Sequence, residues 1–284
     1  MIIRSLAILT HARQGLPPGS FMAHLAEAWR REGRKVLVHQ GLGQPPEADA
    51  AWLHVDLSVV PEPYLELMER FPLRINGAVR DITRRAVSQS LVVPADDYQG
   101  PVIVKTDLNY RGKPEADLAR KASSAARRGL RALRGQLPAR YAGRLPGGEY
   151  LVLPDKAAVP RWIWRAPELV VERYFGHLDG RANRVGMWYF LGRRQVVAPI
   201  AGQGAVLRFA RNAETLPLED EAPPDAQRRR RELGFDYGKF DLVIQADVTR
   251  VIDATRPPYA QLPPLAGIDL EICRRLAPGL DDLA

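Results

Sequence analysis

Cysteine is almost absent from this sequence, since Cys273 is the one cysteine among 284 residues. A single cysteine excludes an internal disulfide framework and a cysteine-rich zinc site, and this usage suits the reducing cytosol. Long apolar runs are missing too, because no window approaches the ~18 to 20 uninterrupted apolar residues that a membrane span requires. The sequence therefore predicts a cytoplasmic protein without a membrane segment.

A signal peptide, internal repeats and a histidine cluster are missing as well. The short apolar run in MIIRSLAILTHARQG is followed by His11 and Arg13, where a signal peptide needs small residues and a longer apolar core. This run is typical of a first β-strand. Histidines with no metal-ligand spacing are expected to be ordinary core or surface residues, His11 being the main exception. They are His11, His24, His39, His54 and His177.

Acidic residues are outnumbered by basic ones. The sequence has 41 Lys and Arg against 33 Asp and Glu, a formal net charge of +8, which makes nucleotide phosphates, nucleic acids and acidic surfaces candidate partners. The excess is concentrated in residues 120–144 and in the arginine run 228–231. Neither segment has the interleaved aromatic residues of a base-stacking surface, so we interpret both as solvated helix surface and do not expect nucleic-acid binding.

The first part of the chain predicts an open α/β sheet. Apolar strands and amphipathic helices follow in the order β-α-β-β-α, with Ser20 as the N-cap of the first helix. This order is Rossmann-like in its general class, although the G-x-G-x-x-G pattern is missing. The expected strands are residues 2–10, 34–40 and 50–57, and the expected helices are residues 21–32 and 61–71.

The remaining chain alternates strands with charged loops. Trp162 and Trp164 alternate as in a strand, and packing in the core is favoured over stacking on a substrate. Helices are expected at 81–91, in the basic segment 113–145 with breaks at Gly129, Gly135 and Pro138, and around the arginine run 228–231. Strands are expected at 101–112, 149–155 and 169–175, and hairpins at 184–201 and 239–255.

Two of these segments place charged residues where a nucleotide and its metal would need them. Lys105 ends the apolar run PVIV, a position from which its charge can offset phosphates. Asp241 and Asp253 lie in the hairpin KFDLVIQADVTRVIDAT, where a carboxylate is costly to desolvate unless a cation meets it. Either both aspartates lie on the solvent face of an edge hairpin, or they bind a hard cation such as Mg²⁺.

In this order the elements resemble the ATP-grasp superfamily, the fold of D-alanine:D-alanine ligase, glutathione synthetase and biotin carboxylase, over roughly residues 75–260. The resemblance implies an α/β chain, α+β in its ATP-binding lobes, with a Rossmann-like lobe at residues 1–78. The small nucleotide-binding lobe would take residues 79–175, including the basic helical insert 113–145. The large lobe would take residues 176–284, with the metal-binding hairpin.

ATP and Mg²⁺ are the cofactors that the resemblance implies. The family's "vivKp" strand looks like PVIVKTD, and its V-E-K-x-[LI] pattern with a later acid looks like VERYF followed by Asp179. The implied nucleotide contacts are Arg84 or Arg85 and Lys105 for the phosphates, Glu172, Arg173, Tyr174 and Phe175 for adenine, and Asp179 for ribose. The loop TDLNYRG is not the family's Gly/Ser-rich phosphate lid, and Asn109 and Arg111 are the candidates in it for covering phosphates.

The family's metal hairpin, R-x-D followed by E-x-N-x-x-P, looks like KFD and IDATRPP in this sequence. The resemblance implies Mg²⁺ ligands at Asp241, Asp253 and Thr255, with Lys239 in place of the arginine that stabilises charge on the acceptor. Asp253 is one methylene shorter than the usual Glu, and Thr255 replaces an amide carbonyl by a hydroxyl. Arg184 is a candidate for contacting phosphate or acceptor, with an exposed salt bridge as the alternative.

The implied activity is that of a ligase that activates a carboxylate as an acylphosphate for attack by an amine or a thiol. Two alternatives stay open: a small-molecule kinase with the same nucleotide site, and a non-catalytic protein that binds a nucleotide or a partner. The substrate is expected to be a small-molecule or carrier-bound carboxylate, with His11, Arg13 and Asn76 as candidate contacts. The oligomeric state stays open, with a homodimer as one candidate because dimers are common in the family.

Overall fold

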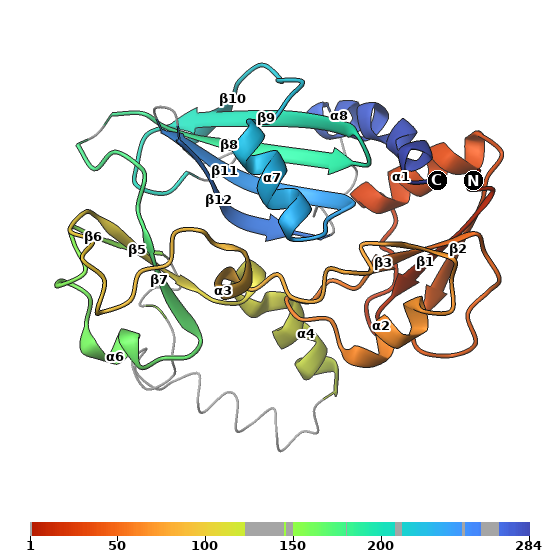
Figure 1. The fold of residues 1–284 in the computed structure, drawn as a ribbon, viewed down its shortest axis with the longest axis horizontal. Coiled ribbons are helices and arrows are strands. Elements are labelled where there is room, and N and C mark those ends of the chain that lie inside the picture. Colours follow the sequence, from red (N-terminus) through yellow and green to blue (C-terminus); the bar gives the residue numbers. More distant parts are fainter. Residues whose placement is uncertain are drawn as a thin grey trace.

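The computed structural model describes residues 2–122, 145, 150–179, 181–207, 212–245, 248–256 and 267–284 (Figure 1). Its framework is a parallel N-terminal sheet, a small antiparallel sheet and a large antiparallel sheet, which confirms the α/β class. None of the described helices has the length and apolar character that crossing a membrane requires. Most of the basic segment 113–145, its expected breaks, and the proline-rich stretch after Arg256 lie outside the described residues.

The N-terminal sheet has the predicted β-α-β-β-α order, followed by one short strand more. Its elements are β1 (Ser5–Thr10), α1 (Phe21–Arg31), β2 (Lys35–Gln40), β3 (Ala50–His54), α2 (Glu62–Met68) and β4 (Leu73–Ile75). The strands run parallel in the order β2-β1-β3-β4. The sequence pattern does not predict β4, because three residues are too few to show a period. The Ser20 hydroxyl accepts a hydrogen bond from the Ala23 N–H at 3.3 Å, which confirms the predicted N-cap.

The small sheet has the antiparallel order β6-β5-β7. Its elements and their neighbours are α3 (Arg84–Val87), β5 (Val102–Thr106), η1 (Asn109–Gly112), α4 (Lys113–Ala122), β6 (Leu151–Leu153), α6 (Arg161–Trp164) and β7 (Leu169–Arg173). The strand expected around Trp162 and Trp164 is wrong, since both lie in α6, which follows Pro160. The run W-I-W is apolar throughout and fits either period. Both tryptophans pack against the core of the small sheet, as expected.

The large sheet contains both predicted hairpins and is antiparallel, in the order β10-β9-β8-β11-β12. Its elements are β8 (Asn183–Leu191), β9 (Arg194–Gly202), β10 (Ala213–Thr215), α7 (Pro224–Glu232), β11 (Tyr237–Gln245) and β12 (Val248–Thr255), followed by α8 (Ile268–Leu276) and η3 (Ala277–Leu283). Side-chain alternation gives the sheet two different faces. Trp188, Phe190 and Phe240 share a core with Ala226 of α7, whereas Tyr189 packs in the core that includes α8.

A β-bulge interrupts the alternation in β12. The register shifts between Asp241 and Leu242, so that Asp241 pairs with Asp253 and Leu242 with Val251, and Ile252 is left without a partner. A bulge re-aims the side chains beside it. Here Val251 and Ala254 both pack in the core shared with α7, and the two residues between them face the other way.

The four arginines 228–231 lie in or directly beside the last turn of α7, as predicted, but two of them are not solvated surface. Arg229 donates hydrogen bonds to the carbonyls of Ala86 and Val87 in α3. Arg230 donates to the Gly192 and Asp236 carbonyls, and its guanidinium lies 4.1 Å from the centroid of the Phe190 ring. The composition of a run cannot show which of its members reach neighbouring carbonyls.

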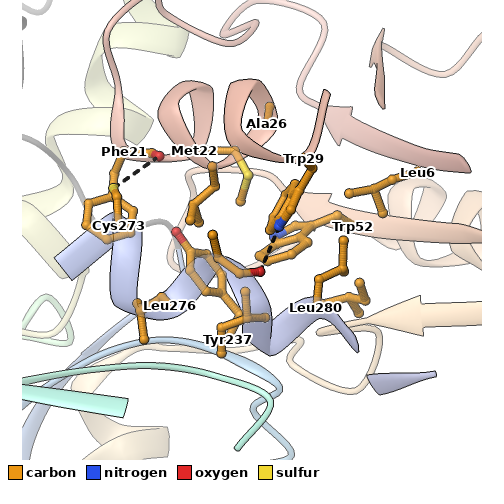
Figure 2. Close-up of a cluster of buried hydrophobic side chains, with 14 of the residues drawn as sticks. Leu6, Phe21, Met22, Ala26, Trp29, Trp52, Tyr237, Cys273, Leu276 and Leu280 are labelled. Carbon is orange, nitrogen blue, oxygen red and sulfur yellow. Dashed lines mark hydrogen bonds between the residues drawn. The ribbon is translucent and has the colours of Figure 1, made fainter. Parts of the chain in front are cut away.

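The N-terminal sheet and the large sheet share one core (Figure 2). Trp29 of α1 donates its indole N–H to the Ala277 carbonyl at 2.8 Å, and the Trp52 and Tyr237 rings meet edge to face at 4.5 Å. Cys273 of α8 is buried beside Phe21. The lobe boundaries 1–78, 79–175 and 176–284 stay a prediction.

Candidate functional site

Two adjoining cavities, of about 610 and 290 Å³, are lined by the small sheet, the large sheet and the loop between β5 and α4. The smaller cavity is lined by the ends of β5 and β7 and by the β11–β12 hairpin. The larger cavity extends along β8 and β9 to α8. Their common walls include Arg84, Tyr150, Asp241 and Asp253.

Asp241 and Asp253 lie opposite each other on β11 and β12 and face both cavities. Like charges directly across a ladder are destabilising, so cations are needed here. Arg84 donates from both terminal nitrogens to the two oxygens of Asp253, at 2.9 and 3.1 Å. Lys239 forms an ion pair with Asp241, with Nζ 2.9 Å from Oδ1. The aspartates therefore do not lie on a solvent-facing edge.

Burial governs the electrostatics of this group. It raises the pKa of Asp253, an effect that Arg84 opposes and Asp241 reinforces. Burial is the largest influence on Lys239 and disfavours its charge, but Asp241, Tyr110 and Tyr189 together outweigh burial and raise the pKa of the amine. The site therefore keeps its lysine protonated and would gain from a further cation between the carboxylates.

Lys105 enters the smaller cavity from β5, as the sequence predicts for a strand end. Its amine donates to Glu172 Oε2 at 2.7 Å, and both side chains are buried. Glu172 Oε1 has no hydrogen-bond partner among the described residues, and Glu172 does not line the cavity. Glu172 thus lies behind Lys105 and holds the amine in place.

The chain leaving β7 forms the rim of the smaller cavity, with Arg173, Tyr174 and Phe175 in its lining. The Arg173 N–H donates to the Ser90 carbonyl at 2.7 Å, and the Tyr174 N–H donates to the Pro101 carbonyl at 2.8 Å. These two donors are therefore used within the fold. Of the three backbone N–H groups, that of Phe175 has no hydrogen bond among the described residues and is the one left for adenine.

The loop after Lys105 forms a fixed wall of the larger cavity. The Asn109 amide donates to the Ala254 carbonyl at 2.9 Å and lies 3.4 Å from Thr255 Oγ1. Tyr110 and Arg111 adopt positive φ angles of 45° and 59°, which is uncommon for residues other than glycine and marks a constrained turn. Asn109 holds this turn against the end of β12.

No protein-family model and no curated protein matches this sequence. Among solved structures, the ATP-grasp ligase PsnB, complexed with a phosphomimetic variant of minimal precursor, Mg and ADP, is similar with a TM-score of 0.50 and 15% identity, covering 96% of this chain and 98% of that chain. The chain has the ATP-grasp fold. D-cycloserine synthetase DcsG matches with a TM-score of 0.45 and 16% identity, covering 97% and 99%. D-alanine–D-alanine ligase from Bacillus anthracis matches with a TM-score of 0.46 and 11% identity, covering 99% and 96%.

Some residues expected at the ATP-grasp site are not brought to the cavities. Of the two candidate arginines, Arg84 lines both cavities, while Arg85 is half-exposed and bonded to Asp107. Asp179 is exposed, pairs with Arg181 and lines neither cavity. Arg184 lines the smaller cavity and also forms the exposed salt bridge, with Glu219, that the sequence left open.

The N-terminal candidates for substrate contact have structural partners instead. Asn76 donates to the Tyr237 carbonyl at 2.8 Å and accepts from the Asp236 N–H at 2.9 Å, which ties the N-terminal sheet to β11. The ring of His11 lies 5.4 Å from that of Tyr64. None of His11, Arg13 and Asn76 is among the described residues that line the cavities. Asn76 is used in the contact between the N-terminal sheet and the large sheet, which a local sequence pattern does not predict.

Mg²⁺ fits the donor set at the hairpin. The described residues contain no group of three or more His, Cys, Asp and Glu side chains that would hold a metal by themselves. Mg²⁺ is usually bound by one or two carboxylates together with phosphates and water, and Asp241 and Asp253 supply two. Asp241 Oδ1 is buried and lies 2.9 Å from Lys239 Nζ, so a metal ion would have to share Asp241 with that ammonium. Asp253 would have to be shared with Arg84, and Thr255 lies in the same cavity wall.

Three cavity residues escape the sequence patterns: Tyr150, Tyr189 and Asp269. Tyr189 pairs with Lys239 across β8 and β11, so the strand register would have placed it on the cavity face. Asp269 reaches the cavity only because α8 packs over the large sheet, which no local pattern reports.

Proposed function

We propose that this protein is an ATP- and Mg²⁺-dependent ligase that activates a carboxylate as an acylphosphate for attack by an amine or a thiol. The observation that carries the proposal is the gathering of Lys105, Lys239, Asp241 and Asp253 in the walls of two adjoining cavities. This gathering occurs in a fold shared with ATP-grasp ligases. Phosphoryl transfer depends mostly on positioning and charge stabilisation, which such a set of cations and carboxylates supplies.

The smaller cavity is the proposed nucleotide site. Ile103 lines it from the small sheet, and Val243 and Ile252 line it from the large sheet, so an adenine ring would find apolar contact from both sheets. The Phe175 N–H is a donor for the edge of the base. Lys105, held by Glu172, would contact the phosphates where they leave the base.

The junction of the cavities is the proposed reaction centre. Asp241, Asp253 and Thr255 would hold Mg²⁺, which when bound supplies charge that offsets the phosphates. The substrate carboxylate oxygen would attack the γ-phosphorus and ADP would leave; the amine or thiol would then attack the acyl carbon and phosphate would leave. Lys239 would keep its proton and stabilise the charge on the acceptor oxygens.

One observation favours a second candidate, a nucleotide-binding protein without turnover. Arg84 engages both oxygens of Asp253, and Thr255 offers a hydroxyl where the family pattern has an amide. Both features weaken the metal site more than the nucleotide site. ATP turnover separates these two candidates. The product of turnover separates a ligase from a kinase, because the ligase releases inorganic phosphate whereas the kinase leaves the phosphoryl group on a hydroxyl.

Thermal unfolding with MgATP, MgADP and MgGTP tests the proposal. Saturation at about 100 times Kd should stabilise the wild type by roughly 2.7 kcal/mol, and Lys105→Ala and Asp241→Asn should lose this gain. Lys35→Ala on the exposed edge of β2 and Asp225→Asn on the surface of α7 are matched controls that should keep it. Stabilisation that survives both site variants would refute the proposed nucleotide site. If both site variants lose the stabilisation, release of inorganic phosphate that depends on an added carboxylate and amine would distinguish the ligase from the binding protein.

A further inference from the structure

The larger cavity continues beyond the charged junction along a wall that the proposed chemistry does not use. This wall comes from β8, β9 and α8, and its side chains include Met187, Ala198, Ile200, Ile268 and Ile272. An apolar ligand group that covers apolar surface in an open cavity removes this surface from water, which favours binding. The wall therefore fits an aliphatic or similarly apolar substituent.

One carboxylate interrupts this apolar wall. Asp269, in the first turn of α8, lines the same cavity and makes no side-chain hydrogen bond or ion pair in the part of the chain that the structure describes. Burial raises the pKa of Asp269, as expected for a carboxylate that has lost water without gaining a partner. By contrast, Glu271 in the same turn is paired with Arg274 and Arg275.

An acid in a first helical turn also stabilises the helix dipole, and that role would need no ligand. Glu271 already supplies such a charge to α8 from a position that does not line the cavity. Asp269 differs in being directed at a cavity beside apolar side chains. Asp269 is half-buried, and a ligand cation would give its carboxylate the partner that the described residues do not supply.

Tyr189 connects this carboxylate to the proposed reaction centre. Burial raises the pKa of its hydroxyl to about 12, with Lys239 lowering it and Asp269 and Asp241 raising it. The Tyr189 hydroxyl is therefore within electrostatic reach of both ends of the larger cavity. A molecule held at Asp269 lies on the same side of the sheet as Lys239 and Asp241.

We propose that this wall binds the nucleophile of the ligase reaction, a primary amine that carries an aliphatic substituent and enters as its ammonium ion. A proton must leave the ammonium before the amine attacks the acyl carbon and phosphate leaves, and Asp269 would accept that proton. Asp269 pairs with the ammonium group, and the apolar side chains of β9 and α8 cover the substituent. The inference rests on the proposed function, because the amine acts as a nucleophile only if the protein is a ligase. The binding of the amine itself is independent of nucleotide.

Isothermal titration calorimetry of the full chain with leucinamide, glycinamide, N-acetylleucinamide and isovalerate tests the inference, with and without MgADP. Leucinamide has both the ammonium and the aliphatic group, and each other probe lacks one of them or carries the opposite charge. We expect leucinamide to bind at least about tenfold more tightly than glycinamide, because burial of the side chain adds affinity. N-acetylleucinamide and isovalerate should bind at least about tenfold more weakly as well, because Asp269 would be left unpaired.

Variants assign the effect to this wall. Asp269→Asn should weaken leucinamide about tenfold or more, whereas Glu271→Gln, on the same turn of α8, should leave it unchanged. Ile268→Ala, at a half-buried position, should reduce the preference for leucinamide over glycinamide. Thermal unfolding without ligand confirms that each variant is folded.

Leucinamide binding that is undetectable, or is equal in wild type and Asp269→Asn, would overturn the inference, as would tighter binding of isovalerate. If MgATP still stabilises the protein in those cases, the proposed nucleotide site stands without this amine site. If leucinamide binds as expected and MgATP has no effect, the amine site stands and the proposed ligase fails.

Discussion

Arg84 and Asp253 form a closely matched ion pair inside the site. Arg84 is 3% exposed, and both of its terminal nitrogens bond to the carboxylate. The guanidinium therefore occupies the place beside Asp253 that a metal ion would otherwise take. Arg84 holds a position from which it can respond to both the metal and the phosphates of a nucleotide.

Replacing Arg84 by Gln should destabilise the protein without metal by about 3 to 5 kcal/mol, because the buried Asp253 loses its cation. Millimolar Mn²⁺ or Mg²⁺ should restore much of that stability, as the two aspartates become free to bind the ion. Thermal unfolding with and without metal measures both effects. Arg85→Gln is the control, since Arg85 lines neither cavity. Equal metal responses in the two variants would contradict this role of Arg84.

At the scale of elements, three segments bring two partly buried acids and a buried arginine together. Asp56 follows β3, Glu115 lies in α4, and Arg256 follows β12. Glu115 accepts a hydrogen bond from the Ser58 N–H at 2.7 Å, and Arg256 donates to the carbonyls of Val79 and Leu57. Burial raises the pKa of Asp56 to about 6, reinforced by Glu115 and opposed by Arg256 and Lys113.

This group predicts a pH dependence of stability. The folded pKa of Asp56 lies above its unfolded value of 3.8, so the folded state holds the proton more tightly, and stability should fall as pH rises from about 4 to 6. Asp56→Asn should make this fall in stability less steep and stabilise the protein at pH 7 by up to about 3 kcal/mol. Urea unfolding between pH 4 and 7 measures it. Glu47→Gln, at an exposed position, should keep the wild-type slope. An unchanged slope in Asp56→Asn would reject the assignment.

The elements also show what the sequence could predict. The hairpins of the large sheet and the strand that carries Lys105 have long alternating or apolar runs, and the structure contains them. β4 and β10 are three residues each and give no period, and the apolar run around Trp162 fits a strand as well as a helix. Lys105, Asp241 and Asp253 were placed by the family resemblance, whereas Asp269 depends on how α8 packs on a distant sheet. Whether such a residue reaches the cavity depends on the packing of distant elements, which a local sequence pattern does not report.

At the scale of the whole molecule, the N-terminal sheet is not an independent body. Its Trp52 contacts Tyr237 of β11, its helix α1 packs with α8, and Asn76 bonds to the backbone of β11. One core therefore spans segments from the two ends of the chain (Figure 2). The N-terminal sheet is therefore fixed to the sheet that carries the aspartates.

A fragment of residues 1–78 should consequently fail to fold, although its boundary is the one predicted for a domain. It would expose the faces of Trp29 and Trp52 that the C-terminal segments cover. Circular dichroism and amide NMR of the fragment, beside the full chain, test this. A fragment with dispersed amide signals and a cooperative thermal transition would show that the predicted boundary separates independent domains.

The bulge at Ile252 has a consequence for how this chain can change in length. The bulge is what allows the adjacent residues Ile252 and Asp253 to line the same cavity, one with an apolar side chain and the other with a carboxylate. Deleting one residue there would regularise the ladder and turn Ile252 or Asp253 into the core beneath α7. An insertion or deletion of one residue in this hairpin would therefore turn side chains to the opposite face of the sheet, whichever residue is added or removed.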